Sequence, residues 1–305
     1  MDGVIVLALG GAAAVISWWA MMRWPLSLNL LRLYPKRVGS TAVGWAASWT
    51  LPAPLLGRLA RVFHMNLAEA ELPLEAYPSL QALFTRRLKP GLRPQAEPLP
   101  GSITCPVDGR MVACGRIVAG QAIQAKGLPY RIDELLKHDP EARRFEGGHY
   151  LTLYLSPQDY HRIHVPLSGR VEAVGRVEGE LWPVNEASTT HVPRLYERNR
   201  RATWVARGTG ADEGLEVAAI LVGATHVGGV IIDPRWLGGR ALPRNGALAV
   251  PGLDCRPGED LGTFQFGSTV VLLIGGAQAG RWRPARADGP VRVGQRLGCF
   301  MDGEM

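Results

Sequence analysis

The run Thr269-Val270-Val271-Leu272-Leu273-Ile274 directly follows Phe266-Gly267-Ser268 near the C-terminus. An uninterrupted run of apolar, mostly β-branched residues is typical of a strand. Working outward, similar short runs separated by glycines occur at 110–118, 149–155, 169–177, 215–222 and 226–232, with a further candidate strand at 291–300. Many short strands with close turns predict an α+β protein whose main body is an antiparallel β sandwich or barrel.

Helical patterns precede this β-rich part. Residues 55–63 and 79–88 have helical apolar spacing, and Ser79 stands where an N-cap is expected. The segment 91–100 contains three prolines and reads as a linker. Within the β-rich part, 131–136 and 195–199 are the obvious short helices. The sequence therefore predicts three parts: an apolar N-terminal membrane segment (1–25), a basic and aromatic helical region (26–90) and a β-rich catalytic domain (101–305).

The N-terminal segment has the length of a membrane helix. Residues 3–22 contain no charged side chain, which is enough to cross the hydrocarbon core of a bilayer. Gly10-Gly11 and several alanines weaken this pattern, so a helix lying in the interface is the alternative. A cleaved signal peptide is disfavoured, because only the acidic Asp2 stands between Met1 and the apolar stretch.

The region that follows has the composition of a membrane surface. Residues 3–68 contain no Asp or Glu, while Arg, Lys and Trp recur among them. Cations meet anionic headgroups and Trp sits at headgroup level, which predicts N-terminal membrane-associating helices. An ordinary basic helical face is the alternative. These residues also carry most of the net charge of +7, and no nucleic-acid motif accompanies them, so nucleic acid is not expected as a partner.

The charges next to the apolar segment and the cysteine pattern both indicate a cytoplasmic location for the globular body. Arg23, Arg32, Lys36 and Arg37 follow the apolar segment and place the globular body on the cytoplasmic side of the cell membrane. The four cysteines, Cys105, Cys114, Cys255 and Cys299, are far apart and form no CxxC pair or zinc spacing. They read as reduced structural thiols of a cytoplasmic domain.

The Gly267-Ser268 step is a candidate for backbone self-cleavage. Gly267 has no Cβ and tolerates unusual backbone angles, so its carbonyl is open to attack by a neighbouring hydroxyl. A Gly-Ser-Thr sequence that enters a strand is more often a simple turn or bulge. Other residues have to support the cleavage interpretation.

Two further motifs carry ionisable groups. Asp108 lies in Cys105-Pro106-Val107-Asp108-Gly109, and His161 and His164 lie in Ser156-Pro157-Gln158-Asp159-Tyr160-His161-Arg162-Ile163-His164. If Ser156 capped a helical turn that continued, the two histidines would share a face. His161, His164 and Asp108 could form a two-His-one-carboxylate metal site. Ser268, His164 and Asp108 could instead form a triad, directed at an ester or at the protein's own backbone. The Gly-x-Ser-x-Gly elbow of many ester hydrolases is missing.

Taken in order, these motifs resemble the bacterial phosphatidylserine decarboxylases from about Tyr34 to the C-terminus. The matching segments are Pro106-Val107-Asp108-Gly109, Gln124-Ala125-Lys126-Gly127, Tyr154 to His164, Val184-Asn185, Val222-Gly223-Ala224-Thr225 and Gly267-Ser268-Thr269. Phe266 stands where the family commonly has Leu before the cleavage motif, and the scissile bond itself is unchanged.

The resemblance implies a self-processing proenzyme. Asp108, His164 and Ser268 would form the processing triad, and cleavage between Gly267 and Ser268 would give a β chain (1–267) and an α chain (268–305) that remain associated. Ser268 would become a covalent pyruvoyl cofactor, without a metal, and Schiff-base chemistry there would convert phosphatidylserine in the bilayer to phosphatidylethanolamine and CO₂.

The resemblance also implies roles for other residues. His161 would lie near the substrate and either bind its carboxylate or deliver a proton. Lys126 and Asn185 would contact the headgroup phosphate, line the substrate pocket or be structural. A homodimer is the default expectation for the assembly.

Overall fold

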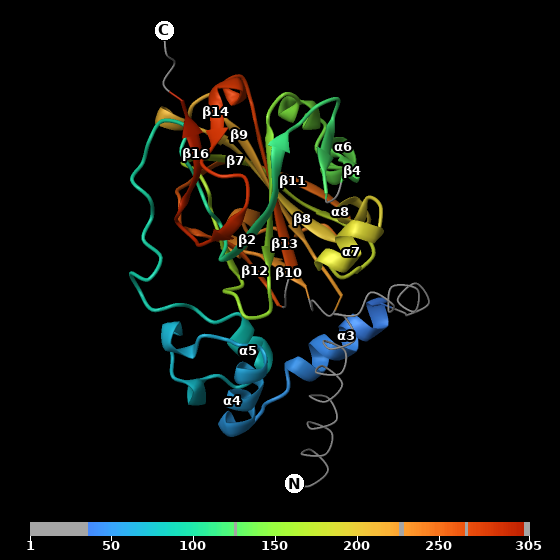
Figure 1. Cartoon of the computed structure of the whole chain (residues 1–305), viewed down its shortest axis with the longest axis vertical. Coiled ribbons are helices and arrows are strands. Elements are labelled where there is room, and N and C mark those ends of the chain that lie inside the picture. The colour runs from blue at the N-terminus through green and yellow to red at the C-terminus, as the bar shows by residue number, and fades with distance from the viewer. Residues whose placement is uncertain (1–35, 125–126, 226–228, 266–267, 302–305) are drawn as a thin grey trace.

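In the computed structural model, residues 36–124, 127–225, 229–265 and 268–301 are described. Within these residues, three short α-helices precede the β-rich body: α3 (Lys36–Ala47), α4 (Ala53–Val62) and α5 (Leu80–Phe84). Figure 1 shows them together at one end of the molecule, remote from the strands labelled β14 and β16. The 3₁₀ turns η1 (Leu67–Glu69) and η2 (Leu74–Ala76) lie between α4 and α5.

An open, fully antiparallel eight-stranded sheet forms the centre of the β-rich body, in the order β11-β7-β8-β9-β13-β5-β2-β15. Its strands are β2 (Gly109–Arg116), β5 (His149–Leu155), β7 (Gly169–Val177), β8 (Arg201–Gly208), β9 (Glu216–Val222), β11 (Gly246–Cys255), β13 (Ser268–Gly275) and β15 (Gly289–Val291).

Smaller sheets and short helices complete the described fold. The sheets are β1-β16-β14, β10-β12-β6 and β3-β4. Their strands are β1 (Ile103–Thr104), β3 (Gln121–Ile123), β4 (Pro129–Arg131), β6 (Arg162–His164), β10 (Val230–Ile232), β12 (Asp260–Phe264), β14 (Trp282–Pro284) and β16 (Arg296–Phe300). The helices are α6 (Ile132–Leu135), α7 (Glu186–His191), α8 (Leu195–Arg198) and the 3₁₀ turns η3 (Ala142–Phe145), η4 (Gly210–Asp212), η5 (Pro234–Leu237) and η6 (Ala279–Arg281).

The predicted antiparallel β body is confirmed, and the barrel alternative is wrong. The large sheet does not close, because β11 and β15 remain at its edges. The edge strand β15 is only three residues long and contains Pro290. Proline has no backbone N–H to donate to another strand, so it suits an edge and opposes further pairing.

The apolar run 269–274 lies in the central strand β13, whose two faces are both buried. Val271 and Leu273 of β13 belong to one hydrophobic core, together with Leu56 of α4 and Phe84 of α5. The alternate residues, such as Leu272, belong to a second core on the other face. Because side chains alternate across a strand, burial of both faces requires the uninterrupted apolar run.

The N-terminal part differs from its prediction in one respect. Helix α5 ends at Phe84 rather than near residue 88, and the Thr85 hydroxyl donates to the Gln81 carbonyl at 3.1 Å as it ends. Residues 86–89 are extended instead, and Leu88 forms a β-bridge with Ala70. Ser79 caps α5 as predicted, since its hydroxyl accepts the Ala82 N–H at 3.1 Å.

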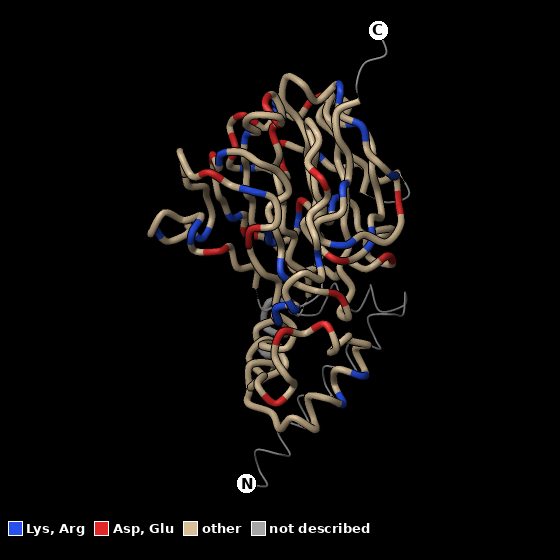
Figure 2. Tube along the Cα trace, turned by 90° about the vertical axis from the view of Figure 1, so that its left-hand side faces the viewer, with Lys and Arg blue, Asp and Glu red and all other residues tan. Residues whose placement is uncertain are grey.

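The membrane segment predicted for residues 1–25 lies outside the described residues. Within the described part of the chain, no helix combines the length and apolar character needed to span a bilayer. Figure 2 shows Lys and Arg interspersed with Asp and Glu over the β-rich body. That body therefore has charges of both signs on its surface.

Candidate functional site

Ser268 is the first residue of the central strand β13. It pairs with Leu155 of the neighbouring strand β5 and is completely buried. Among the described residues its Oγ has no hydrogen-bond partner. A buried hydroxyl without a partner is unfavourable, and such groups are frequent where chemistry takes place. Gly267, the other half of the predicted cleavage site, lies outside the described residues.

His161 follows the turn that leaves β5 and is fully buried. Its Nδ1 lies 2.8 Å from the Asp159 carbonyl oxygen, and its ring packs edge-on against Phe84 with centroids 5.3 Å apart. A carbonyl only accepts hydrogen bonds, so Nδ1 carries the proton and Nε2 is the unprotonated nitrogen. Nε2 is buried without a partner among the described residues. Burial lowers the pKa of His161 to about 3, so the imidazole is neutral at physiological pH.

His164 is the last residue of β6, and its tautomer is fixed by the backbone. Its Nδ1 lies 2.9 Å from the Gly258 carbonyl oxygen, and the Tyr160 hydroxyl lies 3.2 Å from its Nε2. Nδ1 therefore donates and Nε2 presents a lone pair that accepts the phenolic proton. Burial lowers the pKa of His164, although the Gly258 carbonyl and Asp260 oppose this effect. His164 is thus a neutral base.

The predicted helical face shared by His161 and His164 is wrong. The Ser156 N–H donates to the Asp159 carboxylate at 2.7 Å, and a single turn follows, after which the chain enters strand β6 at Arg162. Residues three apart in extended backbone point to opposite sides. The two histidines therefore have different surroundings.

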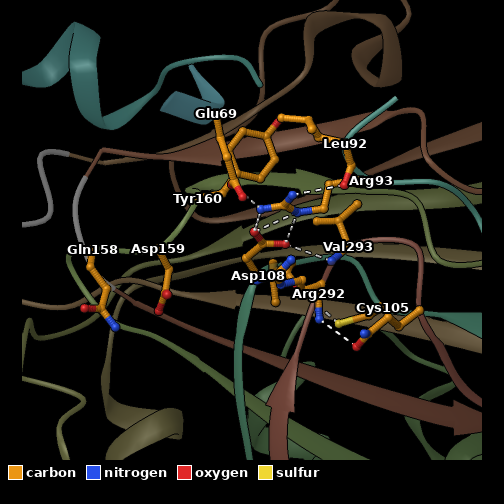
Figure 3. Close-up of polar contacts among 12 residues, drawn as sticks. Glu69, Leu92, Arg93, Cys105, Asp108, Gln158, Asp159, Tyr160, Arg292 and Val293 are labelled. Atoms are coloured by element: carbon orange, nitrogen blue, oxygen red, sulfur yellow. Dashed lines mark hydrogen bonds and ion pairs between the residues drawn. The ribbon is translucent and has the colours of Figure 1, made fainter. Parts of the chain in front are cut away.

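Asp108 is held by Arg93 rather than by a histidine, as Figure 3 shows. Arg93 Nε donates to both carboxylate oxygens at 3.0 and 2.9 Å, and Nη2 donates to Oδ2 at 2.5 Å. The Val293 N–H also donates to Oδ1 at 2.9 Å. In a processing triad Asp108 would be expected to accept a hydrogen bond from His164 Nδ1. That nitrogen donates to the Gly258 carbonyl oxygen instead. Asp108 acts on His164 as a nearby negative charge that raises its pKa slightly against the effect of burial.

Arg93 also reaches the helical region. Its Nη2 donates to the Glu69 carboxylate at 2.6 Å, and its side chain is almost buried. Burial alone would lower the pKa of Arg93, but the hydrogen bonds to Asp108 and Glu69 outweigh it and raise that pKa. Sequence reasoning missed Arg93, because it stands in a proline-rich linker where no local pattern indicates a distant carboxylate.

Of Asn185 and Lys126, which were each expected to be either substrate-binding or structural, only Asn185 is among the described residues. The Asn185 side-chain oxygen accepts the Ser188 N–H at 3.0 Å and caps α7, which is a structural contact. Lys126 lies outside the described residues. Cys105 and Cys255 are buried, and burial raises the pKa of each thiol to about 12. No group of three His, Cys, Asp or Glu side chains in the described ranges is arranged around a metal position.

Comparisons of the chain with a family model and with individual proteins all point to one family. The family model described as phosphatidylserine decarboxylase matches residues 80–300. A phosphatidylserine decarboxylase proenzyme of Anaeromyxobacter sp. (strain K) is 42% identical over 287 residues, covering 90% of this chain and 98% of the relative. The proenzyme of Myxococcus xanthus (strain DK1622) is 35% identical with the same coverage of both chains. That of Coxiella burnetii (strain RSA 493 / Nine Mile phase I) is 39% identical over 88% of this chain and 96% of the relative.

Proposed function

The chain belongs to the phosphatidylserine decarboxylase family, and from this we propose that it converts phosphatidylserine to phosphatidylethanolamine and CO₂ after cutting itself at Ser268. The observation that carries the proposal is Ser268 itself. It opens the central strand, is fully buried, and has a hydroxyl without a partner among the described residues. A buried hydroxyl without a hydrogen-bond partner supports a role for Ser268 in covalent chemistry.

Self-processing begins with His164 as the base. Its Nε2 lone pair takes the Ser268 hydroxyl proton while Oγ attacks the Gly267 carbonyl carbon. The C–N bond breaks, and an ester replaces the amide. Loss of the Ser268 Cα proton and cleavage of the Cβ–Oγ bond release residues 1–267 as a carboxylate. Addition of water to the remaining dehydroalanine and loss of ammonia give a pyruvoyl group at position 268.

The residues around Ser268 fit such a group. Ser268 lies in a paired strand and is fully buried, so a carbonyl there would be kept from bulk water. A pyruvoyl group at position 268 would supply the carbonyl that binds the substrate amine and accepts the electron pair released with CO₂. No metal ligand is needed for this chemistry.

His161 is proposed to carry the proton of the decarboxylation step. Because its imidazole is neutral and Nε2 holds a lone pair, it offers no positive charge to bind the substrate carboxylate. It can instead take a proton from the substrate ammonium, which frees the amine, and return that proton to Cα after CO₂ has left. Of the two roles considered for His161, proton delivery is therefore favoured.

We further propose that the helical region holds the enzyme on the cytoplasmic face of the cell membrane. Arg58 and Arg61 of α4 are exposed on the side opposite the buried Leu56 and Leu59. Trp45 of α3 is 64% exposed. Exposed cations and an exposed Trp in this region match the headgroup layer of a bilayer. Pelleting with anionic vesicles, but not with purely zwitterionic ones, is the expected result.

The experiment that tests the activity uses the purified full chain and phosphatidylserine in mixed micelles. We expect CO₂ release, loss of activity on treatment with hydroxylamine, and an uncut, inactive Ser268→Ala variant. Normal activity of Ser268→Ala would contradict the proposal. Whether the processed protein is a homodimer, as expected by default, is read from its mass in solution.

A further inference from the structure

Arg86, just beyond α5, is a buried cation without adequate partners. Only 4% of its surface is exposed. Its Nη1 and Nη2 lie 3.4 and 3.5 Å from the carbonyl oxygens of Leu83 and Gln158, at the outer limit for hydrogen bonds. Among the described residues its Nε has no hydrogen-bond partner, and no carboxylate there forms an ion pair with it. A buried guanidinium in this condition is strongly unfavourable unless an anion neutralises it.

Arg86 lines a pocket of about 510 Å³ between the helical region and the β-rich body. Asp108, Tyr154 and Tyr160 line the same pocket, and so do the exposed Arg110 and Arg292. A buried cation with two exposed cations around it is the arrangement expected of an anion-binding site. The volume is within the range of small-molecule sites.

The acidic residues that line this pocket have other partners, which leaves Arg86 available to bind an anionic ligand. Asp108 and Glu69 are both occupied by Arg93. The Asp159 carboxylate accepts the Ser156 N–H at 2.7 Å and is therefore also engaged elsewhere. Arg86 remains charged although burial lowers its pKa, because a guanidinium titrates far above physiological pH.

We propose that Arg86 binds the phosphodiester of the substrate headgroup in this pocket, an inference that rests on the proposed function. The pocket adjoins the reaction site, because its lining residue Tyr160 directly precedes His161 and places its hydroxyl 3.2 Å from His164 Nε2. The other anion of the substrate is the carboxylate that leaves as CO₂. A cation held on that carboxylate would stabilise the ground state and slow the reaction. The phosphodiester keeps its charge throughout, so binding it assists capture of the substrate without this penalty.

The first test separates KM from kcat. Arg86→Gln should raise KM for phosphatidylserine about 10- to 100-fold with kcat changed less than about 3-fold, as expected for loss of a charge-assisted interaction made equally in ground and transition states. Arg143→Gln, which removes an exposed arginine of η3, is the matched control and should leave both constants unchanged. Rates are normalised to the amount of cut α chain. An unchanged KM for Arg86→Gln overturns the proposal.

Arg86→Lys covers the case in which the glutamine variant does not fold. It keeps the charge but loses the planar fork of donors, so KM should rise several-fold with kcat preserved. A lysine variant with wild-type KM, or one in which kcat falls and KM does not change, overturns the proposal.

The second test does not depend on catalysis. Glycerophosphoethanolamine, a soluble phosphodiester, should raise the melting temperature of the processed protein by about 2–4 °C at saturating concentration, and this shift should vanish in the Arg86 variant. Inorganic phosphate is the comparison probe. If phosphate stabilises the protein and the diester does not, or if the variant responds like the wild type, the proposal is wrong. If wild-type protein binds the diester through Arg86 but releases no CO₂ from phosphatidylserine, the proposed function fails and this site stands.

Discussion

The Arg93 guanidinium and the Asp108 carboxylate form three hydrogen bonds of 2.5 to 3.0 Å, and both side chains are nearly buried. Arg93 comes from the segment that joins the helical region to the β-rich body, and it also binds Glu69 of η1 (Figure 3). One side chain thus ties the helical region to the carboxylate predicted to support processing. Docking of that region and the position of Asp108 are physically linked.

Replacement of Arg93 should therefore impair processing. Arg93→Gln removes the charge-assisted bonds to Asp108 and leaves that carboxylate almost buried without its main partner, at a cost of about 1–3 kcal/mol. We expect a slower appearance of the α chain on a time-course gel. Glu69→Gln is the control, because it removes the negative charge at position 69 while the bonds between Arg93 and Asp108 remain. If Arg93→Gln matures at the wild-type rate, the pairing has no role in processing.

Tyr160→Phe should leave processing intact. The Tyr160 hydroxyl donates to His164 Nε2, the nitrogen proposed to accept the Ser268 proton, and therefore competes with that reaction. The phenylalanine ring can keep the stacking on His164, whose centroid lies 5.6 Å away. The variant should be cut at least as fast as wild type, while His164→Ala stays uncut. Complete loss of cleavage in Tyr160→Phe would show that Nε2 is not acting as an independent base.

His161 should make the protein less stable in acid. An unfolded histidine has a pKa of about 6.5, whereas that of folded His161 is about 3. Between these values the unfolded state binds more protons, so the free energy of unfolding falls as pH falls, by up to about 1.4 kcal/mol per pH unit from this group. His161→Gln should lose less stability between pH 6.5 and 4 in denaturant titrations. Asp159 and His149 titrate in both proteins, so their contributions cancel in the comparison. Parallel curves for the two proteins would refute the assignment.

Asn185 should affect stability rather than catalysis. Its side chain caps α7, and an N-cap replaced by alanine costs about 1 kcal/mol. Asn185→Ala should lower the free energy of unfolding by this amount with KM and processing unchanged, and Asn185→Ser should restore most of the loss. A raised KM at wild-type stability would instead assign Asn185 to the substrate pocket.

The fold could be predicted where local pattern and burial agree. The segments 149–155 and 169–177 were predicted at the bounds that the structure has, because each is a run of strand-forming residues. Strand β8 was missed because Arg201 and Arg207 break its apolar character. Arg201 is nevertheless buried, and backbone carbonyls such as that of Leu135 at 2.7 Å accept its N–H groups. Such compensation comes from segments distant in sequence and leaves no local signal.

The site was predictable only as a set of reactive residue types. Ser268, His161, His164 and Asp108 all lie where β2, β5, β6 and β13 begin or end, but their partners differ from those expected. The Gly258 carbonyl takes the place foreseen for Asp108 on His164 Nδ1. A backbone carbonyl is present at every residue, so its use as a hydrogen-bond acceptor leaves no mark in the sequence. An arginine whose partners are distant in sequence leaves none either. Arg86 and Arg93 therefore became visible only in three dimensions.

The most direct test of the central claim is the intact mass of the purified full chain, combined with the chemistry of its C-terminal fragment. We expect two fragments, residues 1–267 and an α chain that begins at position 268 with a carbonyl reactive toward hydroxylamine and no free amine. A single uncut species under native conditions, or an α chain that begins with an unmodified serine, would contradict that claim.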